Sequence, residues 1–125
     1  MHVRTLLTTA NDCPNKWDCP SVHELDIDPG GRYLISKQTS LAEREAFTHL
    51  LASGEVVGWV PEGLLDESNS LLDRTRGVAG EALLSGRRYV ITTAVTDVSI
   101  LALFGDLVGR GEQIGRTSAQ ELAVI

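Results

Sequence analysis

The sequence predicts an α+β protein built from two tandem β-β-α-β repeats, packed with pseudo-two-fold symmetry around a shared core. The motif RYLIS at 32–36 recurs in the second half as RYVIT at 88–92, and strand-like and helix-like patterns alternate in both halves. The chain has 125 residues, of which 42% are hydrophobic, enough for one domain with a single core. We expect the repeats at about 20–65 and 77–125.

A second set of identities supports the repeat, with a slightly longer offset between the matched positions. The offset changes by one residue between a predicted strand and a predicted helix, where loops absorb insertions. The alternative is a chance alignment of short motifs. The matched residues are Phe47, Leu50, Gly54, Glu55 and Gly58 in the first half and Phe104, Leu107, Gly111, Glu112 and Gly115 in the second.

Residues 1–19 are predicted to form an irregular arm, and the first repeat begins with a hairpin. Two Cys-Pro pairs in the arm remove backbone donors and push the preceding residues towards extended geometry. An extended run at 22–25 is followed by DPGG at 28–31, a strong turn sequence, because proline fixes one φ and glycine accepts a positive φ. Residues 32–37, rich in aromatic and β-branched types, form the second strand.

A helix and a third strand complete the first repeat. Ser40 caps the helix, and Glu43 three residues later completes a capping box. Apolar residues recur at helical spacing from Leu41 onwards, and Gly54 ends the helix. Residues 55–60 form the third strand, which a proline stops.

The linker at 66–76 and the helix of the second repeat have distinctive patterns. Leu71 and Leu72 are predicted to pin the linker through one helical turn. The segment 98–108 is apolar nearly all round, unlike the amphipathic helix of the first repeat. Such a helix must be covered on most sides, so we expect it to pack centrally between both sheets or to form a homodimer interface.

The overall charge and the apolar pattern narrow the partners and the compartment. The formal net charge is −6 and the pI is about 4.9, so direct nucleic-acid binding is not expected, because an acidic surface repels phosphates. No apolar run approaches the roughly 20 residues of a transmembrane helix, so no membrane contact is expected. The N-terminal apolar patch is too short for a secretory signal, which predicts a cytoplasmic protein with reduced cysteines.

Both cysteines and one histidine lie in the stretch NDCPNKWDCPSVH at 11–23. Cys13, Cys19 and His23 are candidate zinc ligands, although the cysteine spacing is wider than usual and a fourth ligand is needed. The alternatives are a regulatory thiol pair, or a buried Cys19 with an incidental Cys13. No other cofactor is predicted. The fourth zinc ligand would come from His2, His49, Asp12, Asp18 or Glu24.

No convergent set of catalytic side chains is recognised, so an enzyme is not favoured. Ser21 and His23 lie close on an extended segment, but no glycine-framed nucleophile elbow surrounds them. Asp106 is an unusual carboxylate within the apolar segment, and burial there would require an arginine partner. The alternative is a small-molecule binder or an enzyme with a pocket between the repeats, around Asp106 and Tyr89.

Several short motifs stand out in the first half: CPSV at 19–22, a Glu24-x-Asp26 pair, GEVV at 54–57 and PEGLL at 61–65. Together they resemble a group of small acidic actinobacterial proteins of unassigned function, often found near helix-turn-helix regulators. That group has a Cys-Pro-[Ser/Thr]-Val start and a Pro-x-x-Leu-Leu end. The resemblance covers residues 11–65 and implies a regulatory accessory role. The second half departs from it by lacking cysteine.

These observations favour a non-catalytic regulatory or adaptor protein that acts through contact with a protein partner, as an accessory to a transcriptional regulator. Trp17 and Trp59 are the predicted partner-binding residues, because aromatic side chains are enriched at binding hot spots. The alternative for Trp59 is a core position, since tryptophan is largely buried in most proteins. The competing function is a zinc or thiol redox sensor that uses Cys13, Cys19 and His23.

Overall fold

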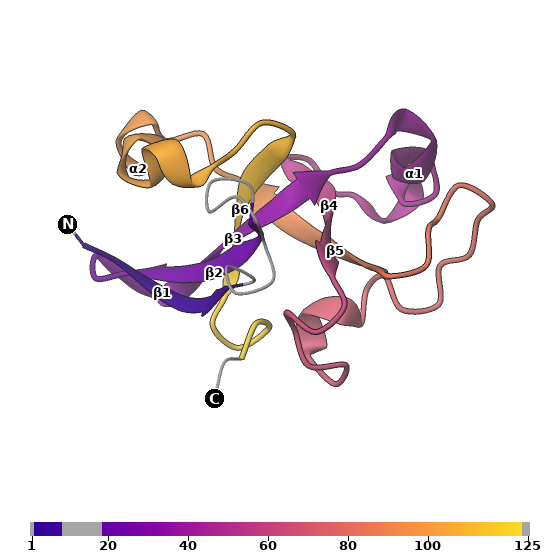
Figure 1. Cartoon of the computed structure of the whole chain (residues 1–125), viewed down its shortest axis with the longest axis horizontal. Helices are drawn as coiled ribbons and strands as arrows, with labels where there is room; N and C mark the ends of the chain where they lie inside the picture. The colour runs from indigo at the N-terminus through magenta and orange to yellow at the C-terminus, as the bar shows by residue number, and fades with distance from the viewer. Residues whose placement is uncertain (1, 9–18, 124–125) are drawn as a thin grey trace.

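The computed structural model describes residues 2–8 and 19–123, and its main feature is one six-stranded antiparallel sheet (Figure 1). The strands are Val3–Thr8 (β1), Ser21–Leu25 (β2), Asp28–Gln38 (β3), Glu55–Pro61 (β4), Arg87–Ala94 (β5) and Glu112–Ser118 (β6). Each strand pairs with the next, and β3 also pairs with β6, so that the last four strands close into a ring. The predicted α+β class is therefore confirmed in its coarse form, a mostly antiparallel sheet with few helices.

Two short α-helices connect strands at opposite sides of the molecule (Figure 1). The first, α1 (Leu41–Glu45), joins β3 to β4, and the second, α2 (Val98–Phe104), joins β5 to β6. The capping box of Ser40 and Glu43 is confirmed. However, α1 ends earlier than predicted, and the chain turns so that Phe47 is buried. None of the described helices is long and apolar enough to cross a membrane.

In the described part of the chain, three short 3-10 helices accompany these elements: η2 (Thr48–Leu50), η3 (Ser70–Leu72) and η4 (Gly105–Leu107). The helical turn predicted in the linker is confirmed by η3, where Leu71 and Leu72 are both buried. The other two, η2 and η4, follow α1 and α2 respectively, at positions that correspond to each other in the repeat alignment.

The pairing of β3 with β6 is equivalent, residue for residue, to that of β5 with β4. Ile35 of β3 lies opposite Ile114 of β6. Their counterparts in the repeat alignment are Ile91 and Val57, which lie opposite each other in β5 and β4. The RYLIS and RYVIT motifs therefore occupy equivalent places in the sheet.

The complete tandem β-β-α-β repeat is not shown, because β2 has no counterpart in the second half. Among the described residues, no strand lies between 77 and 86, immediately before β5. The prediction of an irregular N-terminal arm is wrong for residues 3–8, which form β1. Their backbone groups pair with the outer edge of β2, an edge that would otherwise be left open. Residues 9–18 of the predicted arm lie outside the described residues.

The hairpin of β2 and β3 turns earlier than predicted. Leu25 pairs with Asp28, so residues 26–27 form the loop and the DPGG sequence lies at the start of β3. Gly31 is required there because a Cβ atom would lie 2.4 Å from Asp28 Oδ2 and 2.8 Å from Arg116 Nε. Those two side chains form an ion pair between β3 and β6. This glycine therefore permits a close approach rather than a turn.

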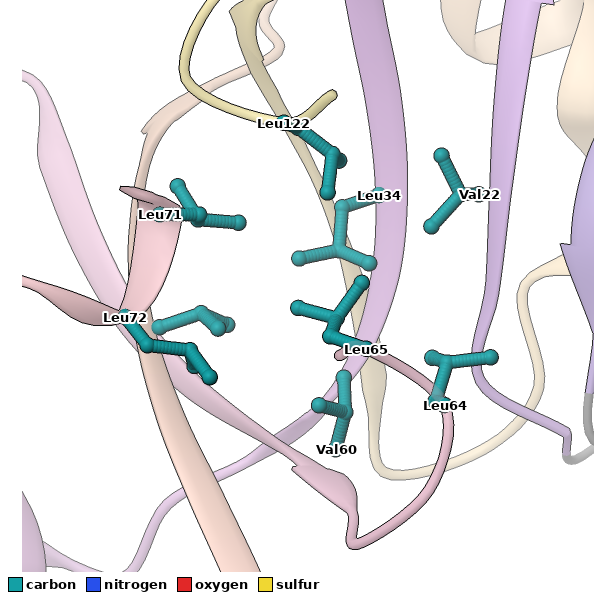
Figure 2. Close-up of a cluster of buried hydrophobic side chains, with 9 residues drawn as sticks. Val22, Leu34, Val60, Leu64, Leu65, Leu71, Leu72 and Leu122 are labelled. Carbon is teal, nitrogen blue, oxygen red and sulfur yellow. The ribbon is translucent and has the colours of Figure 1, made fainter. Parts of the chain in front are cut away.

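The core consists of a central cluster, where the two halves meet, and two flanking clusters. Side chains of the central cluster point towards one another from several strands and loops (Figure 2). Its buried members are Val22, Leu34, Val60, Leu64, Leu65, Leu71, Leu72, Val90 and Leu122. The flanking cluster beside α2 contains Leu25, Tyr33, Ile35, Phe104 and Ile114. The cluster beside α1 contains the counterparts of the last four, Tyr89, Ile91, Phe47 and Val57.

Candidate functional site

His23 of β2 is almost fully buried, and both of its ring nitrogens are engaged. Nδ1 lies 3.0 Å from Thr5 Oγ1, and Nε2 lies 2.7 Å from Ser21 Oγ. The ring meets Phe104 edge-on, with centroids 5.4 Å apart. Burial lowers the pKa of His23 from 6.5 to about 4, because the charged form loses its hydration. His23 is therefore a neutral group that links β1 to β2, and Ser21 is buried beside it.

Of the three predicted zinc ligands, the structure describes Cys19 and His23, whereas Cys13 lies outside the described residues. Cys19 is buried and disulfide-bonded, in contrast to the reduced thiol that the sequence led us to expect. Among residues 2–8 and 19–123, no group of three or more His, Cys, Asp or Glu side chains could hold a metal ion. The zinc site stays a prediction. It requires a state in which the Cys19 thiolate and a His23 ring nitrogen are both free to bind the metal.

The helix α2 is anchored to the sheet by one end and one face. Its first turn is capped by Asp97, whose carboxylate accepts hydrogen bonds from the backbone N–H groups of Ser99 and Ile100. Phe104 is the buried residue of the helix, and its ring lies 5.6 Å from that of Tyr33 on β3. The inner face of α2 thus packs on the β2–β3 hairpin.

Three large apolar side chains of α2 and η4 are exposed, and we call them together the α2 face. It comprises Val98, which is 80% exposed, Leu101, which is 38% exposed, and Leu107 in η4, which is 36% exposed. The expectation that residues 98–108 pack centrally between both sheets is therefore wrong. The helix lies on the outside of the sheet, and only its inner face contributes side chains to the flanking cluster beside it.

Two carboxylates flank the α2 face. Asp97 precedes the helix and Asp106 follows it in η4; both are exposed, and neither is ion-paired within the described part of the chain. Asp106 therefore does not need the arginine partner that burial would require. By contrast, α1 has one large exposed apolar residue, Leu41, followed by charged side chains.

Trp59, a predicted partner-binding residue, is half-buried on β4. The guanidinium of Arg87 lies over its ring, 4.1 Å from the centroid. In the sheet Trp59 lies opposite Lys37 of β3 and Tyr89 of β5. Trp17 lies outside the described residues. Trp59 packs against the flanking cluster beside α1 rather than the one beside α2. Its role in partner binding stays a prediction.

A buried carboxylate network holds Arg87 against Trp59. Glu43 accepts hydrogen bonds from the backbone N–H of Ser40 at 2.9 Å, from Arg87 Nη1 at 2.9 Å and from the Tyr89 hydroxyl. Burial alone would raise the pKa of Glu43, but these hydrogen bonds outweigh it and lower the pKa to about 2. Sequence reasoning identified Ser40 and Glu43 as a helix cap but did not connect Glu43 with Arg87 and Tyr89, which lie far away along the chain.

A cavity of about 440 Å³ opens beside this network, between α1, β4, β5 and the loop before β6. We call it the α1–β5 cavity. It combines charged, amide and apolar side chains rather than the Asp106 and Tyr89 pair that was predicted. The lining residues are Lys37, Gln38, Ser40, Glu43, Trp59, Ala82, Leu84, Arg87, Arg110 and Gly111.

No protein-family model matches the chain, and neither a curated protein nor a solved structure is significantly similar to it.

Proposed function

We propose that this chain is a non-catalytic regulatory or adaptor protein that acts through protein–protein contact, with the α2 face as its docking surface. The observation that carries this proposal is the exposure of Val98 and Leu101 on a helix without a charged side chain. Contact of apolar surface with water is unfavourable, and burial against a partner removes it. The two residues are spaced i and i+3, as in a helix that inserts into a groove.

The partner that fits this surface has an apolar groove with basic residues at its rim. Asp97 and Asp106 lie at the two ends of the α2 face and are available to pair with such residues. The net charge of −6 adds a general attraction towards a basic protein. A DNA-binding regulator offers basic surface of this kind, in keeping with the accessory role that the resemblance to small acidic actinobacterial proteins implies.

We also propose that β3–α1–β4 and β5–α2–β6 are copies of one duplicated unit, and that α2 has diverged into the docking element. The equivalent strand registers and flanking clusters support this proposal. Glu55 accepts a hydrogen bond from the backbone N–H of Ala52, and its counterpart Glu112 does the same with Gly109. The shared residues thus have the same structural roles, whereas the exposed residues of the two helices differ.

Changing Val98 and Leu101 together to glutamate is expected to abolish partner binding while the chain stays folded. Two charges on the α2 face would have to be desolvated in an apolar groove, which weakens binding by at least about 100-fold. A glutamate at position 98 lies in the first helical turn, where a carboxylate is favourable. The measurement is capture of the partner from cells that express the chain, followed by titration of the purified partner with each variant.

Leu41→Glu is the matched control, because Leu41 is the counterpart of Val98 on α1 and is similarly exposed. This variant is expected to bind the partner as the wild type does. Equal loss with Leu41→Glu, or unchanged binding by the double variant, would contradict the assignment of the α2 face. Light scattering of the purified chain tests whether the α2 face instead binds a second copy of this chain. In that case the wild type would be a dimer and the double variant a monomer.

A further inference from the structure

The α1–β5 cavity carries a net positive charge in an otherwise acidic protein. Lys37, Arg87 and Arg110 line it, and Glu43 is the one carboxylate among its lining residues. Glu43 is already engaged by Arg87, Tyr89 and the Ser40 backbone. Because the chain as a whole has a formal charge of −6, three cations at one cavity are a local reversal of the overall charge.

Two of these cations have no carboxylate of their own. Within residues 2–8 and 19–123, Lys37 forms no ion pair, and Arg44 and Arg110 are the arginines that form none. Glu112 lies opposite Lys37 in the sheet, but it does not line the cavity, and one of its oxygens accepts a hydrogen bond from the Gly109 N–H. An anion in the cavity would therefore meet two cations that form no ion pair in the described part of the chain.

The cavity also has an apolar wall. Trp59 contributes a half-buried indole, Leu84 is 51% exposed, and Ala82 lies with them among the lining residues. Arg87 is fixed over the indole by its ion pair with Glu43, so this part of the wall is rigid. Burial of an apolar group against Trp59 and Leu84 would remove apolar surface from water on both partners.

The unpaired cations and the indole of the cavity are not residues that the fold requires. Gly58, Tyr89 and the helix caps have structural equivalents in the other half, but Lys37, Trp59 and Arg110 do not recur. Their counterparts in the repeat alignment are Thr93, Arg116 and Ser53. The second half forms the same backbone with these three counterparts. Lys37, Arg110 and the Trp59 indole are therefore not needed for the backbone and are free to serve binding.

We propose that the α1–β5 cavity binds a small amphiphilic anion, a carboxylate or phosphate monoester with an aromatic or aliphatic body. The anionic group lies between Lys37 and Arg110, because ammonium and guanidinium donors form charge-assisted hydrogen bonds with either oxyanion. The body lies against Trp59 and Leu84. No residue of the α2 face lines this cavity, and α1 and α2 lie at opposite sides of the molecule (Figure 1).

The test is calorimetric titration of the full chain with phenyl phosphate, benzoate, inorganic phosphate and the uncharged phenol. At least one of the two aromatic anions is expected to bind with a Kd on the order of 1 mM or lower, and which one binds identifies the head group. Inorganic phosphate is expected to bind at least about tenfold more weakly than the better aromatic anion, because it lacks the body. In a Trp17→Phe variant, the remaining tryptophan fluorescence should change on binding, since Trp59 lines the site.

Lys37→Gln combined with Arg110→Gln is expected to weaken binding by at least about tenfold. Arg44→Gln is the matched control: it removes the other unpaired arginine, which does not line the cavity, and should leave the Kd unchanged. Circular dichroism checks that all variants stay folded. Absence of binding by both aromatic anions, equal effects of the Arg44 and Lys37–Arg110 variants, or equal binding of phenol would each overturn the proposal.

Discussion

Gly115→Ala is expected to lower the free energy of unfolding by about 3 kcal/mol, because β6 has no room for a Cβ atom at this position. Gly115 lies between Leu34 of β3 and Ala94 of β5, where the ring of strands closes. A Cβ atom there would lie 1.8 Å from Thr92 Oγ1 and 2.5 Å from Thr92 Cβ. The second atom is fixed to the backbone, so the strands must move apart. Equilibrium unfolding in urea at neutral pH measures the loss.

Thr92→Gly in the Gly115→Ala background tests the mechanism, because it removes the Cβ atom that causes the clash. The double variant is expected to be more stable than the sum of the two single losses predicts. Gly58→Ala is the matched control in the other half. Its Cβ atom would meet the ends of two side chains, Ser36 Oγ at 2.3 Å and Gln113 Nε2 at 2.8 Å, and the Lys37 carbonyl oxygen at 3.0 Å. The two side-chain ends can shift, whereas a Cβ atom cannot, so a smaller loss of about 1 kcal/mol is expected. A Gly115→Ala chain as stable as the wild type would contradict this strand closure.

The same contacts explain why the sequence pattern could predict the central strands. Gly58 and Ser36 are the counterparts of Gly115 and Thr92, and both glycines admit a side chain from the strand that passes close to them. Because both halves need this close approach, glycine stands at both positions, and the match is visible in the sequence. Strand periodicity and the Ser40 cap then locate α1 between its strands, and the apolar run at 98–108 locates α2.

Other features depend on contacts that no local pattern encodes. The apolar sequence of α2 fits a buried helix and an exposed docking helix equally well, because hydropathy does not say what covers a surface. DPGG has the composition of a turn, yet the Asp28–Arg116 ion pair over Gly31 places it within a strand. The α1–β5 cavity brings together residues from four separated segments of the chain, so sequence spacing offers no signal for it.

The free energy of unfolding is expected to fall by about 3 kcal/mol between pH 6.5 and pH 4, because His23 is buried in its neutral form. Burial lowers the pKa of His23 in the folded chain to about 4, whereas the unfolded chain takes up this proton near 6.5. Between these values the unfolded state binds more protons, so the contribution is fully present above pH 6.5 and is lost as the pH falls to 4.

Three carboxylates with lowered pKa values lose their contribution to stability at lower pH than His23 does, so the His23 effect can be measured separately. Despite the opposing effect of burial, hydrogen bonds lower the pKa values of Asp28, Glu43 and Glu55 to about 2. Their ordinary values are 3.8 for Asp and 4.5 for Glu, so their contribution to stability is lost mainly below about pH 4.5. The decline from pH 6.5 to 4.5 is therefore the part assigned to His23.

His23→Gln is expected to flatten the stability profile between pH 6.5 and 4.5, whatever its effect on stability at pH 7. An amide can exchange hydrogen bonds with the hydroxyls of Thr5 and Ser21, but it takes up no proton in this range. His49→Gln is the matched control, because His49 is exposed, and it should keep the wild-type slope. Urea unfolding at half-unit pH intervals measures each slope. If the His23→Gln slope equals that of the wild type, the imidazole is not held neutral between β1 and β2, and another group must carry the pH dependence.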